Sequence, residues 1–278
     1  MKENRETMSD VIKNLDMWNT PGQGATYELE HQGIAGQFIY ESETQPILDL
    51  IKRVKPTRML DAGCGTGRHL VLIEGCKNLH AIDYSEEMLS VARKKVPSCT
   101  FACGSIHDTP YEDAFFDMLI SIRVFQHIDG VGPVFCEFDR ILKPGGSAHI
   151  LVYNSWHVHS LNDKLRHSAL ARWISERAQE GSYWKRLYRS YYNRFYSPTE
   201  LVRDAKKAGF ENVNICGATV GMAWFLHSAG FDRVKFKPFR ALLWVYISLA
   251  RIQRNLFKNM FPFKYFFDTY VVTVTRSR

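Results

Sequence analysis

The chain has 278 residues, a net charge of +7 and a hydrophobic fraction of 45%. This length and composition fit one large globular domain, and a domain of 1–278 with several insertions is expected. From Arg233 to the end, ten basic residues and one acid give +9, which leaves −2 for the rest. A partner for the basic part is therefore to be sought near the C-terminal end.

Six cysteines lack the paired spacing of a zinc site, so no metal is expected and the thiols are predicted to be free. The polar stretch 1–18 has no basic start followed by an apolar run, which argues against a secretory signal. The longest strongly apolar run, 241–250, is about half the length of a bilayer span. We expect a cytoplasmic protein.

Short apolar runs alternate with helical patterns along the chain. In chain order they predict a helix over 44–55 capped by Thr44, a strand over 58–61, a helix carrying Leu70–Ile73, a strand over 79–83, a helix capped by Ser85, strands over 100–102 and 117–121, a helix over 131–142, a strand over 147–153, a helix opened by Ser197, and strands over 210–215 and 270–275. Such alternation predicts parallel βαβ units, whose ligands bind beyond the carboxyl ends of the strands.

Three segments interrupt this alternation: an N-terminal cap over 1–43, an aromatic and basic lid insertion over 154–196, and a second insertion over 221–267. Within the last, 239–261 reads as an amphipathic helix. It has two interpretations: packing over the active site or at a homodimer contact, and docking on an anionic membrane.

The most informative stretch is Met59–His69, where a buried strand ends in Asp61 and glycines follow at positions 63, 65 and 67. Glycines at this spacing allow a tight turn and a close approach of a ligand to the backbone. A phosphate would be repelled by the Asp61 carboxylate, whereas an ammonium or sulfonium group would be attracted. Asp83 ends the next strand, where an acid can accept both hydroxyls of a ribose.

This acid-x-Gly-x-Gly-x-Gly pattern resembles motif I of the class I S-adenosylmethionine-dependent methyltransferases. Later segments, Phe115–Leu119, Ser121–Ile128 and Leu142–Gly146, resemble that family in order and spacing. The resemblance implies an α/β, Rossmann-like, seven-stranded sheet of order 3-2-1-4-5-7-6, with the last strand antiparallel, helices on both faces and helical lids. It also implies S-adenosyl-L-methionine as cofactor.

The expected cofactor-binding residues follow from the turn, the second strand and the matching strand ends; they are Asp61, Gly63, Gly65, Gly67, Asp83, Tyr84, Met88, Gly104, Ser105, Ile106, Ile122 and Arg123. Ser105 stands where the family often has an acid. Tyr27 and Tyr40 are candidates to close over the methionine end, or merely to pack. His127 is the candidate catalytic base, although it has an alternative packing role; further candidates are His157 and His159, which follow the strand over 147–153 and could instead lie on the lid surface.

The expected reaction is methyl transfer by in-line displacement to an O, N or C nucleophile of a small aromatic or hydrophobic acceptor. The aromatic insertions favour such an acceptor without identifying it. Two alternatives remain: a tRNA, for which the basic and aromatic residues of 164–196 would form the surface, and a lipid-linked acceptor at a membrane.

Overall fold

The computed structural model describes residues 16–30, 34–73, 76–155, 165, 168–179, 193–219, 237–260, 267 and 269–277. Its strands are β1 (Arg58–Ala62), β2 (Asn78–Asp83), β3 (Thr100–Cys103), β4 (Phe116–Ile122), β5 (Leu142–Tyr153), β6 (Asn212–Gly217) and β7 (Thr269–Thr275). Its helices are α2 (Gln23–Glu30), α3 (Ile34–Val54), α4 (Glu86–Lys95), α5 (Gly132–Ile141), α7 (Ala169–Arg177), α8 (Pro198–Lys207) and α10 (Lys237–Phe257), with 3₁₀ turns η1 (Leu70–Leu72) and η2 (Phe125–His127).

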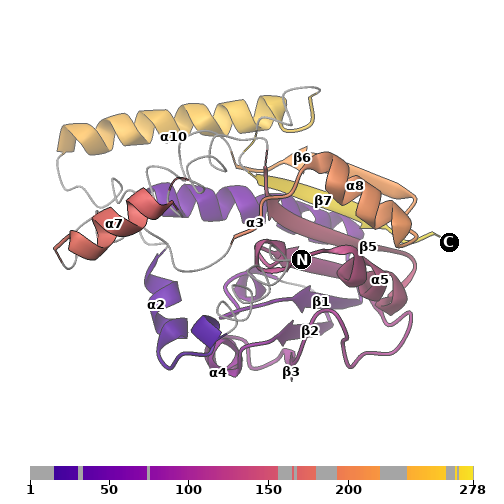
Figure 1. The fold of residues 1–278 in the computed structure, drawn as a ribbon. Helices are drawn as coiled ribbons and strands as arrows, with labels where there is room; N and C mark the ends of the chain where they lie inside the picture. Colours follow the sequence, from indigo (N-terminus) through magenta and orange to yellow (C-terminus); the bar gives the residue numbers. More distant parts are fainter. Residues whose placement is uncertain are drawn as a thin grey trace.

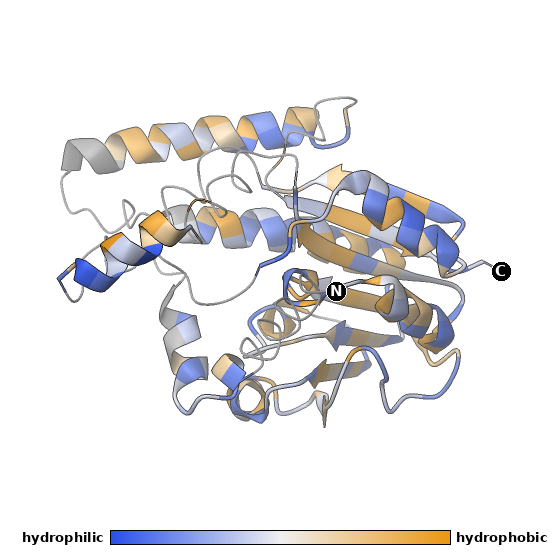
Figure 2. Cartoon of the chain, in the orientation of Figure 1, coloured by the Kyte–Doolittle hydropathy of each residue, from blue (hydrophilic) through white to orange (hydrophobic). Residues whose placement is uncertain are grey.

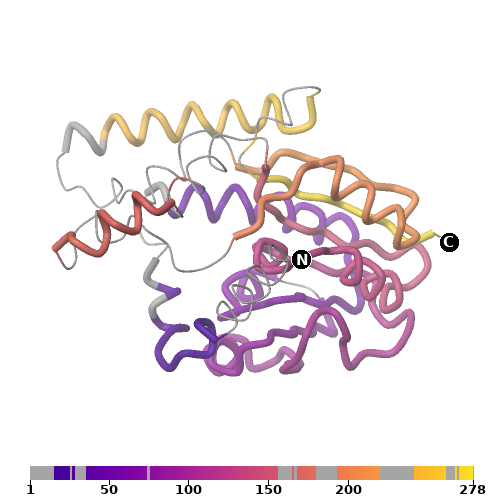
Figure 3. Tube along the Cα trace, in the orientation of Figure 1, coloured from indigo at the N-terminus to yellow at the C-terminus, as the bar shows by residue number. Residues whose placement is uncertain are grey.

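The described strands form one seven-stranded sheet in the order β3-β2-β1-β4-β5-β7-β6, which confirms the predicted topology (Figure 1). Neighbours from β3 to β5 are parallel, whereas β7 is antiparallel to both β5 and β6. Figure 3 follows the chain into this arrangement: the last strand lies between two strands that precede it in sequence. The predicted strand ends agree within a few residues.

Helices cover both faces of the sheet, because successive strand residues point to opposite sides. Leu60 and Leu119 pack toward α5 and α8, in a cluster with Phe135 and Leu201. Their neighbours Met59 and Met118 pack on the other face, in a cluster with Ile47 of α3. Both cores thus depend on the same central strands.

The helix expected to start at Thr44 begins ten residues earlier, at Ile34. Thr44 is therefore not an N-cap; it is buried, and its Oγ1 lies 3.1 Å from His69 Nδ1 in a hydrogen bond. The first turns of α3 form because Phe38 and Ile39 pack against Ile247 of α10. This long-range contact outweighs the local capping signal.

The helix expected after the glycine turn is also wrong, since only the 3₁₀ turn η1 forms there. Ten residues, 68–77, separate Gly67 from β2, and this is a short return path for a parallel crossover. The chain is already extended at Ile73. By contrast Ser85 caps α4 as predicted, with Glu86 and Glu87 in the first turn.

The predicted 239–261 helix is α10, which starts at Lys237 and packs on α3 (Figure 1). Leu243, Ile247 and Ala250 face the protein, whereas a row of apolar side chains on another face is exposed; it comprises Leu242, Val245, Leu249, Ile252 and Leu256. The hydropathy view shows apolar residues recurring along the coloured part of this helix (Figure 2). None of the described helices combines the length and apolar character that a membrane crossing needs.

Candidate functional site: a glycine turn between two buried acids

The chain leaves β1 through a turn in which Gly63, Gly65 and Gly67 all have positive φ angles of 85°, 53° and 73°. A Cβ at Gly63 would lie 2.3 Å from a methyl carbon of Val124, so the turn packs closely there. A Cβ at Gly65 would meet nothing within 4 Å. The middle of the turn is therefore open, and a ligand can approach its backbone.

Asp61 lies at the end of β1, is 1% exposed, and has no hydrogen-bond partner on Oδ2 among the described residues. Burial, with a contribution from the charge of Asp83, raises the pKa of Asp61 to about 8. A carboxyl in this state is destabilised as an anion. It would be stabilised by a cationic ligand group placed beside the unbonded oxygen.

Asp83 ends β2 on the other side of the turn. Its Oδ2 accepts a hydrogen bond from the Gly65 N–H at 2.7 Å, and its Oδ1 accepts one from the Ser85 N–H at 2.9 Å. Burial raises the pKa of Asp83, although these backbone donors lower it. Each carboxylate oxygen can accept a second hydrogen bond. The carboxylate is thus fixed in place and can still bind two hydroxyl groups.

The other expected cofactor residues lie at different depths around this turn. Gly104 is next to Asp83, because its N–H donates to the Asp83 carbonyl oxygen at 3.0 Å. The Ser105 hydroxyl accepts from the His107 N–H at 3.2 Å. Met88, Ile106 and Ile122 are buried, and Tyr84 is exposed, so these four differ in how their side chains can reach a ligand.

Arg123 follows β4 in a left-handed conformation, with a φ of 59°. Its Nε lies 2.9 Å from Glu43 Oε2, and both side chains are almost fully buried. Burial lowers the pKa of Arg123, but the Glu43 carboxylate outweighs this effect and raises it. This partner could not be predicted from the sequence, because Glu43 belongs to α3 and is eighty residues away.

His127, the candidate base, lies on η2 after β4 and is half-buried. Its ring centroid is 5.7 Å from that of Trp18, which in turn is 5.6 Å from Tyr27. The structure therefore brings the N-terminal segment to the same edge of the sheet as the candidate base. His157 and His159, further candidates by position, lie outside the described residues.

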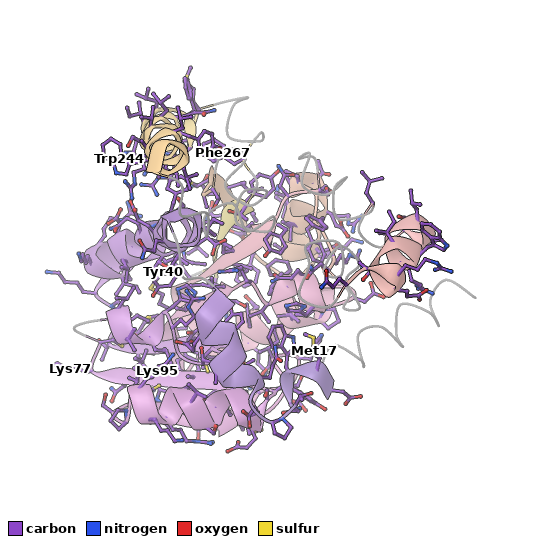
Figure 4. All side chains as sticks on the ribbon, turned by 90° about the vertical axis from the view of Figure 1, so that its left-hand side faces the viewer. Met17, Tyr40, Lys77, Lys95, Trp244 and Phe267 are labelled. Carbon is purple, nitrogen blue, oxygen red and sulfur yellow. The ribbon has the colours of Figure 1, made fainter. Side chains whose placement is uncertain are left out.

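The N-terminal segment contacts the glycine turn and α4. The Ser85 hydroxyl donates to the Trp18 carbonyl oxygen at 2.7 Å, and the Gly22 N–H donates to Glu87 Oε1 at 2.9 Å. Glu28 of α2 accepts a hydrogen bond from Thr66 in the turn and forms an ion pair with Lys95. Figure 4 looks onto this side of the molecule and labels Met17, Tyr40 and Lys95.

A role for Arg68 was also not predicted from the sequence, although this residue directly follows the third glycine. Its guanidinium lies 5.6 Å from the ring centre of Tyr27 and 4.9 Å from that of Tyr40. The Tyr40 hydroxyl donates to the Arg68 carbonyl oxygen at 2.7 Å. The two tyrosines named from the sequence therefore meet at this arginine.

Together these residues fit a nucleoside cofactor with a cationic group. Asp83 has acceptor capacity for two ribose hydroxyls, the open backbone at Gly65 permits close approach, and the unbonded Asp61 oxygen suits a positive charge. A pyrophosphate would meet two buried acids at this turn, so the donor set does not suit a dinucleotide.

Comparisons with known proteins agree with this chemistry. Residues 60–150 match the methyltransferase domain family. The chain is 28% identical over 142 residues to dTDP-3-amino-3,4,6-trideoxy-alpha-D-glucopyranose N,N-dimethyltransferase of Streptomyces venezuelae, covering 47% of this chain and 59% of that protein. It is 34% identical over 97 residues to demethylmenaquinone methyltransferase of Chlorobaculum tepidum, covering 34% and 40%. The chain thus spans about half the length of the curated relatives it matches.

A solved structure shows the same fold over almost the whole chain. It is a S-adenosylmethionine-dependent methyltransferase from Thermotoga maritima, described as a possible histamine N-methyltransferase. It matches with a TM-score of 0.57 and 20% identity, and covers 91% of this chain and 94% of that one. Over residues 60–150, which hold the glycine turn, the chain is thus similar to the methyltransferase domain family, and its fold is that of a solved S-adenosylmethionine-dependent methyltransferase.

Proposed function

We propose that this protein is an enzyme that binds S-adenosyl-L-methionine and transfers its methyl group to an O, N or C nucleophile of a small, aromatic or hydrophobic molecule. The cofactor supplies the activated methyl group on its sulfonium. The chain aligns the nucleophile with that carbon and excludes water, so that proximity supplies most of the rate enhancement.

The observation that carries this proposal is the position of the open glycine turn between Asp61 and Asp83. Asp83 would bind the ribose hydroxyls, since both of its oxygens are held by backbone donors and keep acceptor capacity. Asp61 would stabilise the positive charge of the methionine end. The remaining candidates, from Gly63 to Arg123, are proposed as the surrounding cofactor contacts.

An acceptor of aromatic or hydrophobic character is supported by the side chains near the end of β5. Tyr153 stacks on Phe195 with centroids 5.5 Å apart, and both pack with Phe38 of α3 and Tyr246 of α10. The relatives named above are methyltransferases of a dTDP-linked amino sugar and of demethylmenaquinone, which are small molecules, so a tRNA acceptor is not favoured.

His127 is proposed as a base only if the acceptor holds a proton that must leave before methyl transfer. Its position after β4 and its contact with Trp18 support this role. The role predicts that His127→Gln lowers kcat, while cofactor binding is retained.

The contacts of Trp18, Gly22 and Glu28 support a cap function for 1–43. Most of the proposed lid at 154–196 and of the insertion at 221–267 lies outside the described residues, apart from short ranges that include α7 and α10. One domain over 1–278, with these three additions, and a cytoplasmic location stay predictions.

Isothermal titration calorimetry with S-adenosylmethionine tests the proposed function. Asp83→Ala should weaken binding at least about 10-fold, because two hydrogen bonds to a charged group are lost. Asp108→Ala is the matched control, since Asp108 is an exposed acid. Unaltered affinity in Asp83→Ala would refute the ribose assignment, and no binding by the unmodified protein would refute the function.

For α10 we propose a contact with a second copy of the chain rather than with a membrane. The exposed row from Leu242 to Leu256 has the three-four spacing of a helix–helix seam. Ala241, Ser248 and Asn255 flank it on one side and carry no charge, whereas interfacial helices place Lys and Arg on the polar face. Light scattering should show a dimer that Ile252→Glu converts to a monomer; a monomer that floats with anionic vesicles would support the membrane instead.

A further inference from the structure

Arg68 has a buried donor atom that binds none of the described residues. Its Nη1 is inaccessible to solvent and has no hydrogen-bond partner among the described residues. A buried guanidinium nitrogen in this state is costly, so native structures rarely leave one without a partner. The residue is one position after the glycine turn, at the edge of the sheet where the cofactor is proposed to bind.

The surroundings of Arg68 orient its side chain without neutralising it. The rings of Tyr27 and Tyr40 lie within cation–π range of the guanidinium. The Tyr40 hydroxyl holds the Arg68 carbonyl oxygen and therefore the backbone. Glu28, an acid whose pKa the Arg68 charge lowers, is already bonded to Thr66 and Lys95.

Asp61, at the other end of the same turn, has the complementary deficiency. Its buried Oδ2 is an acceptor with no donor, whereas Arg68 Nη1 is a donor with no acceptor. An α-amino acid carries both missing groups, an ammonium and a carboxylate. One short turn, from 61 to 68, thus offers opposite charges to the two ends of a zwitterion.

We propose that Arg68 binds the carboxylate of the amino-acid end of S-adenosylmethionine, opposite Asp61 at its ammonium. This inference rests on the proposed function and assigns a subsite within that site. Arginine suits this role because its planar fork matches a carboxylate and is weakly hydrated. The two tyrosines limit the rotamers of the side chain, so little conformational entropy is lost on binding.

The test uses two ligands that differ only in the carboxylate: S-adenosylhomocysteine and its decarboxylated form, 5′-deoxy-5′-(3-aminopropylthio)adenosine. Calorimetry measures both with the unmodified protein and with Arg68→Met, Arg68→Lys and Arg203→Met. Arg203 is the matched control, because it is an exposed arginine on α8 paired with its neighbour Asp204.

Arg68→Met should weaken S-adenosylhomocysteine about 10- to 100-fold, the loss expected for a charge-assisted hydrogen bond. The decarboxylated ligand should change by less than about twofold, which also shows that the variant is folded. Arg68→Lys should fall between, since it keeps the charge and loses the fork. Arg203→Met should match the unmodified protein.

Equal losses for both ligands would overturn the inference, since they would mean that Arg68 only supports the turn. No loss for either ligand would also overturn it. If the unmodified protein binds neither ligand, the proposed function itself fails, and this result differs from binding that is insensitive to Arg68.

Discussion

Asp61→Asn should stabilise the ligand-free protein at neutral pH while it weakens cofactor binding. In the folded state burial raises the pKa of Asp61 to about 8, from an ordinary value of 3.8. Between these two values the unfolded chain is ionised and the folded chain keeps its proton, so folding loses stability as pH rises. Above pH 8 Asp61 is ionised in both states, so the loss of folding stability is complete and no longer changes with pH.

Each pKa unit corresponds to about 1.36 kcal/mol. Between pH 5 and pH 8 the ionisation of Asp61 should therefore remove up to about 4 kcal/mol from the free energy of unfolding. Asparagine does not ionise, so the variant lacks this loss. A buried amide without a partner would cost about 1–3 kcal/mol, but this cost does not depend on pH.

Urea denaturation of the unmodified protein, Asp61→Asn and the exposed control Asp108→Asn, at several pH values from 5 to 8, checks the reasoning. The stability of Asp61→Asn relative to the unmodified protein should rise steadily with pH, and that of the control should stay flat. A difference that is constant over this range would refute the buried, protonated carboxyl. The same variant should bind S-adenosylhomocysteine more weakly, because the carboxylate charge that would pair with its ammonium is gone.

Two further predictions concern stability. Gly63→Ala and Gly130→Ala impose the same backbone strain, since their φ angles are 85° and 84°, but only a Cβ at Gly63 would meet Val124. In urea denaturation Gly63→Ala should therefore cost about 1–3 kcal/mol more than Gly130→Ala, and equal costs would contradict the close packing of the turn. Glu43→Gln should lower the free energy of unfolding by about 3–5 kcal/mol, because it leaves Arg123 buried without its carboxylate partner. The double change Glu43→Leu with Arg123→Met should recover much of this stability. A double variant as unstable as the sum of the single variants would argue against the ion pair.

The ends of most strands could be predicted, because they depend on patterns that are local in the chain. Buried parallel strands are short apolar runs, and the acid-flanked glycines mark the end of β1. The family resemblance then supplied the order of the strands. The helix after the turn was predicted wrongly, since the apolar run Leu70–Ile73 suits a helix, whereas the described residues between Gly67 and β2 form a 3₁₀ turn at Leu70–Leu72.

The candidate site divides in the same way. Asp61, Asp83 and the glycines are recognisable because each is next in sequence to the strand that positions it. Glu43, Trp18 and Arg68 are not, since their role depends on contacts made across the fold: Glu43 with Arg123, Trp18 with His127, and Arg68 with Tyr27 and Tyr40.

The sequence by itself therefore determined the backbone of the cofactor turn, because only glycine adopts three positive φ angles at little cost. It also determined that α10 has an apolar side, because a helix repeats every 3.6 residues. Only the tertiary structure decided which face of α10 packs on α3 and which stays exposed. Likewise, only the tertiary structure decided that Asp61 Oδ2 and Arg68 Nη1 are buried without a hydrogen-bond partner among the described residues, because burial and pairing are properties of the packed chain.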